Sequence, residues 1–468
     1  MSSKIILTVV GVAVAGCVAA AASSWYTAQK LDEYVQAGVE HINRSHVMRA
    51  SWYPKSSLPF SRGGVLHLVV LNEQMQENLK AGPVDSGDPE SLQRVQEQMA
   101  EPLPEEKQKP LDLFINVSNS MFPFIVKGEA TLDMSRGTAS ELVQRKAVPV
   151  SLPISMTWIY KAYNQDFNLQ LSMDRWSVTQ PEQNVNVGAA EVSLDGDMRE
   201  ELELNYAWEG VTATSKQPGQ SELEIMPLDG IALLRNFSGI WISPEGHMQL
   251  NGIRSSGADG KVEMGQLRFD TVMDESPSET GTMLNMKQRI SLSKLYLDTQ
   301  QERFNIDDFS LGLNFSGLNK QGMEELAQLA QAETPDFIKM MASLNKITTK
   351  TMRLELAPSS MKLNNGMVTA SGKLESLPFE VEQLMRASAA DTPNPLRYML
   401  QGDLTIAAES KAVLALPAEM RQQLATYQQQ GFISTASTGL SSNMQLRGGE
   451  LTANGQVIPL QDLRTQSE

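Results

Sequence analysis

The sequence contains one cysteine, Cys17, which excludes any intrachain disulfide. Basic side chains are also scarce, because 39 lysines and arginines stand against 55 aspartates and glutamates, for a formal net charge of −16. Binding to nucleic acid relies on clustered lysine and arginine, so this balance argues against a nucleic-acid partner. The sequence also has no polybasic segment of the kind that would bind an anionic lipid surface. The stability of the fold must therefore come from an apolar core.

Signatures of chemistry are missing as well. The four histidines, His41, His46, His67 and His247, belong to no zinc-binding pattern. No nucleophile elbow occurs, and "GADGKVEMG" lacks the glycine spacing of a phosphate loop and is typical of a hairpin turn. The sequence thus predicts no metal, no cofactor and no catalytic residue. A hydrolase without a recognisable motif stays open as an alternative to a non-enzymatic protein.

Long apolar runs are limited to the N-terminus. After Lys4, the run Ile5 to Ala22 is just long enough to span a membrane if the next residues reach the interface, where Trp25 and Tyr26 would form an aromatic belt. Two other interpretations exist: "VAGC" matches a lipobox that would lead to lipidation of Cys17, and "AAA" matches a conventional cleavage site. The residues after Cys17 stay apolar instead of forming a polar tether, which favours the uncleaved spanning helix.

These features predict where the protein is located. We expect residues 1–26 to anchor it in the bacterial inner membrane, with the N-terminus in the cytoplasm and the bulk in the periplasm. Residues 27–45 predict a stalk helix, with Leu31, Val35, Val39 and Ile42 on one face. The alternative is a lipoprotein interaction module of the outer or inner membrane, lipidated at Cys17.

Beyond the stalk, the pattern predicts a mainly β protein with minor α content. Residues 46–284 are expected to be β-rich with an acidic insertion at 73–110, and residues 285–468 to be β-rich with late helices and repeated hairpins. Strict alternation predicts antiparallel, curved sheets in one to three lobes, each with one apolar face. The clearest apolar-face candidates are Leu202, Leu204, Tyr206, Trp208, Phe309, Leu311, Leu313 and Phe315.

The late helices and hairpins are read from local signals. Helices are predicted at 319–333, 334–347 and 417–430, the last two with Thr334 as cap and Pro417 at the first position. The segments "LNNGMVTASGKL" (Leu363–Leu374) and "LRGGELTANGQV" (Leu446–Val457) resemble each other. Each is expected to form a strand before its first glycine and a tight turn at its second, as in a duplicated unit.

These residues carry a family resemblance. "SSWYTAQKLDEYV" resembles the membrane exit of the YdgA/YihF family, bacterial envelope proteins of unknown function. The segments "LYLDTQQERFNIDDFSLGLNF" and "LRGGELTANGQVIPLQDL" are similar to its paired strands and its closing hairpin, with Asn454, Gly455 and Gln456 as the most recognisable triplet. The resemblance covers residues 1–45 and about 285–468. It implies a place in the cell envelope and no reaction.

The predicted apolar sheet face must be shielded from water, and two functions are possible, depending on what shields it. A second layer of protein would make it a closed core, and the protein would then be an envelope scaffold or partner-binding module. A lipid or another hydrophobic envelope component would make it a binding surface, as in the AsmA-like envelope proteins, to which the predicted architecture is similar. The expected partners are therefore the inner membrane, through the N-terminal helix, and a lipid or an envelope protein.

Overall fold

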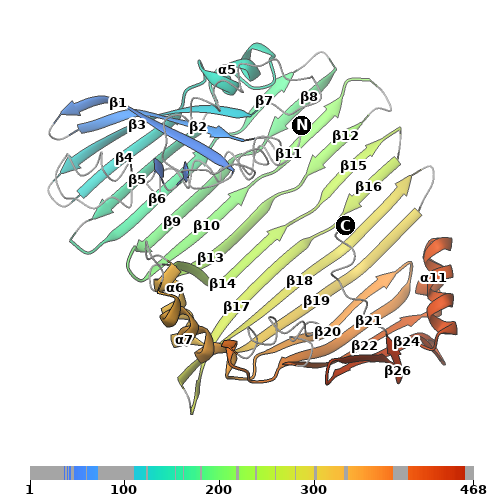
Figure 1. Ribbon diagram of the computed structural model, residues 1–468. Coiled ribbons are helices and arrows are strands. Elements are labelled where there is room, and N and C mark those ends of the chain that lie inside the picture. The colour runs from blue at the N-terminus through green and yellow to red at the C-terminus, as the bar shows by residue number, and fades with distance from the viewer. Residues whose placement is uncertain are drawn as a thin grey trace, which may run out of the picture. The chain divides into compact units, whose positions relative to one another are not determined.

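The computed structural model describes Gln36, Val39, Glu40, Ile42 and Asn43, and residues 47–58, 61–71, 110–122, 125–152, 154–161, 163–179, 182–217, 221–237, 240–258, 260–279, 281–299, 303–330, 336–382 and 399–458. The chain divides into two compact units, unit 1 (Met1–Gln217) and unit 2 (Pro218–Glu468). Strands dominate both units, and every strand pairing within them is antiparallel (Figure 1). The predicted class, mainly β with few helices, is confirmed as open antiparallel sheet.

Unit 1 is a meander of strands with one short helix. Its elements are β1 (Met48–Leu58), β2 (Ser61–Val70), β3 (Leu111–Phe122), β4 (Ile125–Leu132), α5 (Gly137–Gln144), β5 (Ile154–Lys161), β6 (Asp166–Met173), β7 (Trp176–Thr179), β8 (Gln183–Val187), β9 (Ala190–Asp197), β10 (Glu201–Trp208) and β11 (Val211–Ser215). Strands β1 to β6 pair in chain order, and β9 and β10 follow β6. The short strands β7, β8 and β11 extend the same ladders.

Unit 2 is also a meander, with longer strands, and its described part has four helices. Its elements are β12 (Glu222–Ile225), β13 (Leu228–Phe237), β14 (Ile240–Leu250), β15 (Ile253–Gly257), β16 (Gly260–Met264), β17 (Leu267–Ser278), β18 (Gly281–Thr299), β19 (Arg303–Asn319), α6 (Lys320–Ala330), α7 (Phe337–Thr348), β20 (Arg353–Leu363), β21 (Gly366–Ser376), β22 (Leu400–Glu409), α10 (Ser410–Leu414), α11 (Ala418–Gln429), β23 (Ser434–Ala436), β24 (Gly439–Arg447), β25 (Glu450–Ala453) and β26 (Gln456–Ile458). The pairing follows chain order from β17 to β22, and β24, β25 and β26 complete the sheet.

The core of unit 1 is closely packed. Trp158 is almost fully buried and lies across Gly128 of the neighbouring strand, where an added Cβ would lie 2.0 Å from its ring. Phe167 and Leu169 on β6 are also sealed from solvent. Fully burying one such side chain is worth about 1.5–3 kcal/mol relative to leaving it exposed. Unit 1 thus has the core that the cysteine-poor sequence requires.

Strands of both units are interrupted at matched positions. In unit 1, the Gly188 amide donates to the Gly210 carbonyl (2.8 Å) and the Glu209 amide donates to the Ala189 carbonyl (2.9 Å). These two hydrogen bonds join consecutive cross-strand residue pairs. In a regular antiparallel ladder, a hydrogen-bonded residue pair is followed by a pair without hydrogen bonds. The hydrogen-bonding pattern therefore shifts by one residue at this break. Side-chain direction shifts with it, so residues three positions apart across a break share a face.

Unit 2 repeats this break in successive strands. The Met226 amide donates to the Gly252 carbonyl (2.9 Å), and the Asn251 amide donates to the Pro227 carbonyl (2.8 Å). The next pair of strands has the same arrangement, with Gly265 N to Lys294 O at 2.8 Å and Ser293 N to Gln266 O at 2.9 Å. Gly252 has φ 145°, and a Cβ there would lie 2.7 Å from a backbone oxygen, so the break requires glycine at this position.

The late helices lie close to their predicted positions, with different caps. α6 lies within predicted 319–333 and begins after Asn319, whose side chain accepts from the Gly322 amide at 2.8 Å. α7 corresponds to predicted 334–347, but its cap is Asp336, which accepts from the amides of Ile338 and Lys339. α11 corresponds to predicted 417–430, with Pro417 as the N-cap and not the first helical residue.

The repeated hairpins differ from each other more than predicted. In the first copy the tight turn is at Asn364–Asn365, both with positive φ, before Gly366, and the second glycine, Gly372, lies inside β21. In the second copy there are two turns, at Gly448–Gly449 and at Asn454–Gly455. The predicted turn at the second glycine is thus wrong for the first copy, because β21 pairs with β22 through that position.

Several predicted segments fall outside the described residues. They are the membrane anchor with Cys17, most of the stalk helix and nearly all of the acidic insertion. Within the stalk, Val39 and Ile42 are helical and buried, and the Asn43 side chain bonds both the amide and the carbonyl of Ala50 on β1. Among the helices in the described part of the chain, none has the length and apolar character needed to span a membrane.

Candidate functional site

The candidate site is an uncovered apolar face on unit 2, built by the strand breaks. Cross-strand pairing aligns one residue from each of five strands into a row. One row lies on one side of the break and two rows lie on the other side. Partners across an antiparallel pair share a face, so each row is continuous. The rows are Ile225–Ile253–Met264–Leu295–Ile306, Leu228–Leu250–Leu267–Leu292–Phe309 and Gly230–Met248–Phe269–Ile290–Leu311, called the apolar stripe below.

The breaks are what make the stripe continuous. Without the shift at each break, Leu292 and Leu295 of β18 would point to opposite faces, since they are three positions apart. The same spacing separates Leu250 from Ile253 and Ile306 from Phe309. At ordinary strand geometry the three rows span about 19 Å across the strands and about 17 Å along them, or about 300 Å². That size is within the range of functional apolar patches on protein surfaces.

Burial separates this face from a closed core. Every residue of the stripe is half-buried and none is buried, although they are the side-chain types that usually fill cores. In unit 1, by contrast, Leu169 and Leu171 on β6 are 0% and 5% exposed, while Tyr206 and Trp208 on β10, nearer the break, are half-buried. Neighbours within a sheet shield each other only from the sides, so full burial needs a second layer. The exposure indicates that no described segment of unit 2 forms that layer over the stripe.

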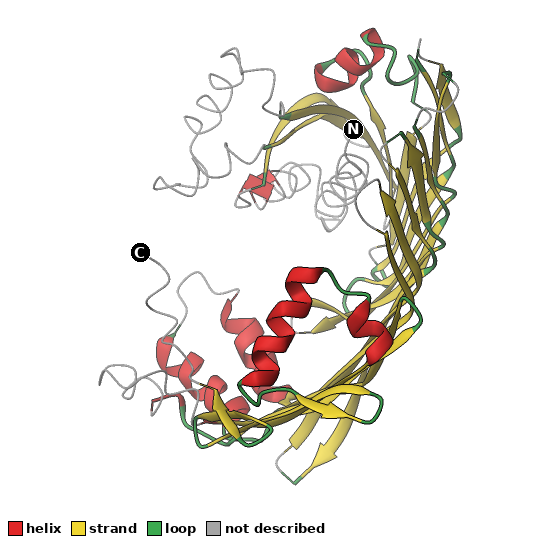
Figure 2. Ribbon diagram, turned by 90° about the vertical axis from the view of Figure 1, so that its right-hand side faces the viewer, coloured by secondary structure: helices red, strands yellow, loops and turns green. Residues whose placement is uncertain are grey.

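The helices of unit 2 lie at the edges of this face. α6 packs against β18 and β19, where Leu284 is buried, and pairs with α7 through Glu325, which accepts from Ser343 and Lys346. α10 packs over β20 to β24, with Gly366 close to Ala412. Figure 2 shows the helices of unit 2 on one side of its sheet. Within the described residues, no helix packs extensively against β12 to β17.

The opposite face carries the charges. Between the apolar rows, the alternate positions hold ion pairs such as Arg254–Glu224 (3.4 Å) and Lys294–Glu263 (3.4 Å). Arg268 donates to Asp270, which also bonds His247 at 2.9 Å, and these contacts hold the pKa of Asp270 below its usual value. The stripe itself contains no charged residue. The sheet is therefore amphipathic across β12 to β19.

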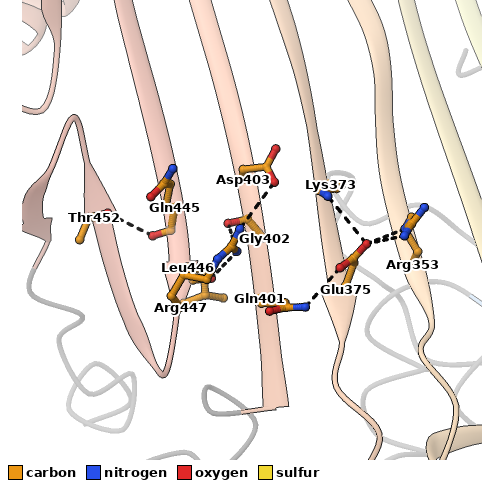
Figure 3. Close-up of polar contacts among 10 residues, drawn as sticks. All are labelled: Arg353, Lys373, Glu375, Gln401, Gly402, Asp403, Gln445, Leu446, Arg447 and Thr452. Carbon is orange, nitrogen blue, oxygen red and sulfur yellow. Dashed lines mark hydrogen bonds and ion pairs between the residues drawn. The ribbon is translucent and has the colours of Figure 1, made fainter.

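The polar face continues to the C-terminal strands. Figure 3 shows Glu375 on β21 between Arg353 (2.7 Å), Lys373 (4.0 Å) and Gln401 (3.3 Å), while Arg447 lies 3.9 Å from Asp403 and donates to the Gly402 carbonyl. On the other face of the same strands, Leu354 and Leu374 are paired and 39% and 36% exposed. This ladder is a solvated face, and the apolar side opposite it remains open.

A clamp marks the break in unit 1. Arg175 makes two hydrogen bonds of 2.5 Å to Glu209, and Glu209 also accepts from the Ala189 amide at 2.9 Å. The guanidinium of Arg175 first, and then the Ala189 amide, lower the pKa of Glu209 to about 2. On either side of this break, the indole nitrogens of Trp176 and Trp208 are buried without a hydrogen-bond partner in the described structure.

The eight predicted apolar-face residues separate into two sets. Leu202 is buried, and Leu204, Tyr206 and Trp208 are half-buried on β10 of unit 1. Phe309, Leu311, Leu313 and Phe315 lie half-buried on β19 of unit 2, and the first two belong to the apolar stripe. The expectation that all eight face one interior stays a prediction. Sequence reasoning missed the stripe residues on β12 to β18, because alternation alone does not continue across the breaks.

Other groups in the described part of the chain do not suggest metal chemistry. No group of three or more His, Cys, Asp or Glu side chains in that part could hold a metal ion. His67 contacts Asp112 and stacks on Phe114, with ring centroids 4.3 Å apart. This histidine is buried and fully engaged in packing and hydrogen bonding, which is what a structural role requires.

Comparison with known proteins identifies the family of the chain. The profile of a bacterial protein family of unknown function (DUF945) matches residues 153–461, more than half of the chain. The chain belongs to this family. The match begins just before β5 and extends past β26, so it covers the strands that carry the breaks and the stripe. It does not single out the YdgA/YihF group. Searches of curated proteins and of solved structures returned no significant match.

Proposed function

We propose that this protein is a non-enzymatic component of the bacterial cell envelope that binds the hydrocarbon part of a lipid-like ligand on the apolar stripe. The observation that carries this proposal is the half-buried state of every stripe residue, from Ile225 on β12 to Leu311 on β19. Apolar surface left in water is unfavourable by roughly 25 cal/mol per Å². A ligand that covers the stripe recovers part of that free energy.

The chemistry of the stripe favours a hydrocarbon. Its backbone groups are engaged in the ladders, and its side chains offer methyl, methylene, thioether and aromatic groups with no charge. A hydrocarbon chain makes no hydrogen bonds with water, so it gives up no hydrogen bond when it binds to such a surface. The breaks widen the apolar face along the strands, so it suits an elongated ligand lying across them.

The proposed location supplies such ligands. We propose that residues 1–26 anchor the protein in the inner membrane with the remainder in the periplasm, on the basis of the uncharged run after Lys4. The alternative is lipidation at Cys17. Mass measurement of the N-terminal peptide distinguishes them: an intact Met1 supports the spanning helix, whereas an acylated Cys17 as first residue contradicts it.

One observation favours a second candidate, a partner-binding or scaffold function. α11 has no buried residue, and its apolar side chains Met420 and Tyr427 are 51% and 48% exposed. They lie seven positions apart, on one face of the helix. An exposed apolar helix face is a common binding element for another protein.

The test of the lipid proposal compares the two faces of the sheet. Ile290→Asp places a charge in the third row of the stripe, and Val272→Asp places one on the opposite face of β17, where Val272 is 46% exposed. We expect the purified full chain to carry lipid in native mass spectrometry, Ile290→Asp to lose it and Val272→Asp to keep it. Wild-type protein without lipid, or equal lipid in both variants, would contradict the proposal.

A further inference from the structure

The row next to the apolar stripe contains an isolated polar pair. Thr271 on β17 and Gln288 on β18 are direct cross-strand partners, two positions beyond Phe269 and Ile290. Their side chains therefore point to the same face as the stripe. Gly246, the partner of Thr271 on β14, and Leu313, the partner of Gln288 on β19, flank the pair without adding a polar group. The pair is thus the first polar feature beyond the third row of the stripe, while beyond the first row a single Ser255 lies between Leu223 and Val262.

The hydrogen-bonding capacity of this pair is almost unused. Gln288 donates only to the sulfur of Met286, at 3.6 Å, and a thioether is a weak acceptor. The hydroxyl of Thr271 has no hydrogen-bond partner among the described residues, although Thr271 is only 8% exposed. The Thr271 hydroxyl oxygen is not one of the fully buried atoms that lack a partner, so it can still be reached from outside. A side-chain amide and a hydroxyl are therefore available to a ligand at the edge of the stripe.

Unit 1 shows that the sheet does not need polar residues at this level. In unit 2 the row with Thr271 and Gln288 is the third one away from the break on its side. The row at the same distance from the break in unit 1 is Leu169–Leu194–Leu204. The leucines of β6 and β9 in that row are buried. Packing alone would be satisfied by leucine in both units. The polar pair in unit 2 therefore calls for a different explanation.

We propose that Thr271 and Gln288 bind the uncharged ester group of an acyl lipid whose hydrocarbon chain lies on the apolar stripe. This inference rests on the proposed function. The Thr271 hydroxyl and the Gln288 amide N–H donate to the ester carbonyl, and the Gln288 carbonyl accepts from a neighbouring ligand hydroxyl. Neither the stripe nor the polar pair includes a cation, so an ionised carboxylate or phosphate would be desolvated there without a counter-charge. The ligand class is therefore a neutral acyl ester, such as a monoacylglycerol.

The experiment measures retention of three probes by the full chain in equilibrium dialysis: monolauroylglycerol, the hydrocarbon tridecane and ionised laurate. The variant Thr271→Val/Gln288→Leu keeps size and strand preference and removes the hydrogen-bonding groups. We expect it to retain monolauroylglycerol about tenfold less than wild type, because two hydrogen bonds are lost, and to retain tridecane equally well. Ser291→Val, on the opposite face of β18, is the matched control and should match wild type for every probe.

The outcomes distinguish failure of the ester-binding role from failure of the proposed function. Unchanged tridecane retention shows that the variant is folded and that its stripe is intact. If wild type and variant retain monolauroylglycerol equally while both bind tridecane, the ester-binding role is wrong and the proposed function stands. Preferential retention of laurate by wild type would also overturn the ester-binding role. If wild type retains no probe, the proposed function itself fails, and this inference fails with it.

Discussion

Units 1 and 2 are built from the same kind of strand, yet they use their apolar residues differently. Both have antiparallel strands with matched breaks, and both place apolar residues three positions apart across each break. In unit 1 the rows farther from the break are sealed, as Leu169 and Phe167 show, and those nearest the break are half-buried, as Tyr206 and Trp208 show. In unit 2 the three rows of the apolar stripe are half-buried on every strand from β12 to β19. Strand pattern thus fixes which residues share a face, while a second layer of protein decides whether that face is a core.

The buried apolar residues of unit 2 show where its own cover lies. They are Phe237, Leu284, Ala327, Ile347, Leu363, Ala412 and Ala453. Ala327, Ile347 and Ala412 belong to helices, and Leu284 and Leu363 belong to strands that the helices contact. Unit 2 therefore builds a local core beneath α6, α7 and α10 and leaves the stripe outside it. This arrangement is the physical basis for assigning the ligand surface to unit 2.

The largest expected effect is a difference in stability between the same leucine-to-alanine substitution made in unit 1 and in unit 2. Leu169→Ala in unit 1 should lower the free energy of unfolding by about 2–5 kcal/mol, since it opens a cavity in a sealed core. Leu292→Ala in the stripe should cost clearly less, because Leu292 is half-buried and no cavity forms. Urea unfolding followed by tryptophan fluorescence for unit 1, which holds Trp158, and by circular dichroism for the whole chain, measures both.

Equal losses for Leu169→Ala and Leu292→Ala would show that the stripe is covered in solution. That result would favour the closed-core interpretation and a scaffold function. A double variant of the two should be additive, because the two residues lie in different compact units.

The sequence predicted much of this fold and only part of the site. Alternation in "DFSLGLNF" correctly placed Phe309 and Leu311 on one face of a strand. Apolar residues at helical spacing placed α6, α7 and α11, although the cap of α7 is Asp336 and not Thr334. A period-two pattern stops at Trp208, so it does not include Val211, which lies beyond the break. The signal was present as apolar-x-x-apolar, for example in "QLNGI" and "SLSKL". Exposure of the stripe had no local signal, because it depends on which distant segments pack over it.

The second prediction concerns the clamp at the break of unit 1, which has no counterpart in the stripe. The pKa of Glu209 is about 2 in the folded protein and about 4.5 when the contacts are lost. The folded pKa is the lower one, so the stabilisation from the clamp is fully present above pH 4.5 and is lost as the pH falls towards 2. Glu209→Gln should therefore flatten the pH dependence of the melting temperature between pH 4.5 and 2.

The control for this titration lies in unit 2, where Glu275 forms an exposed ion pair with Lys320 at 2.7 Å. Glu275→Gln should leave the same pH profile close to that of wild type, because a surface ion pair contributes little. A wild-type profile that is already flat between pH 4.5 and 2 would contradict the role of the Arg175–Glu209 clamp.

The smallest effect is expected on the polar face of unit 2, and it tests the assignment of function to the other face. Arg353 and Glu375 are 2.7 Å apart, and the Arg353 side chain is half exposed. A double-mutant cycle with Arg353→Ala and Glu375→Ala should give a coupling free energy of about 0.2–1 kcal/mol, as for other surface ion pairs. Neither variant should change lipid retention, because both side chains point away from Leu354 and Leu374 on the apolar face. A loss of retained lipid in either variant, with the melting temperature unchanged, would move the ligand surface to the charged face and reverse the comparison between the two sides of the sheet.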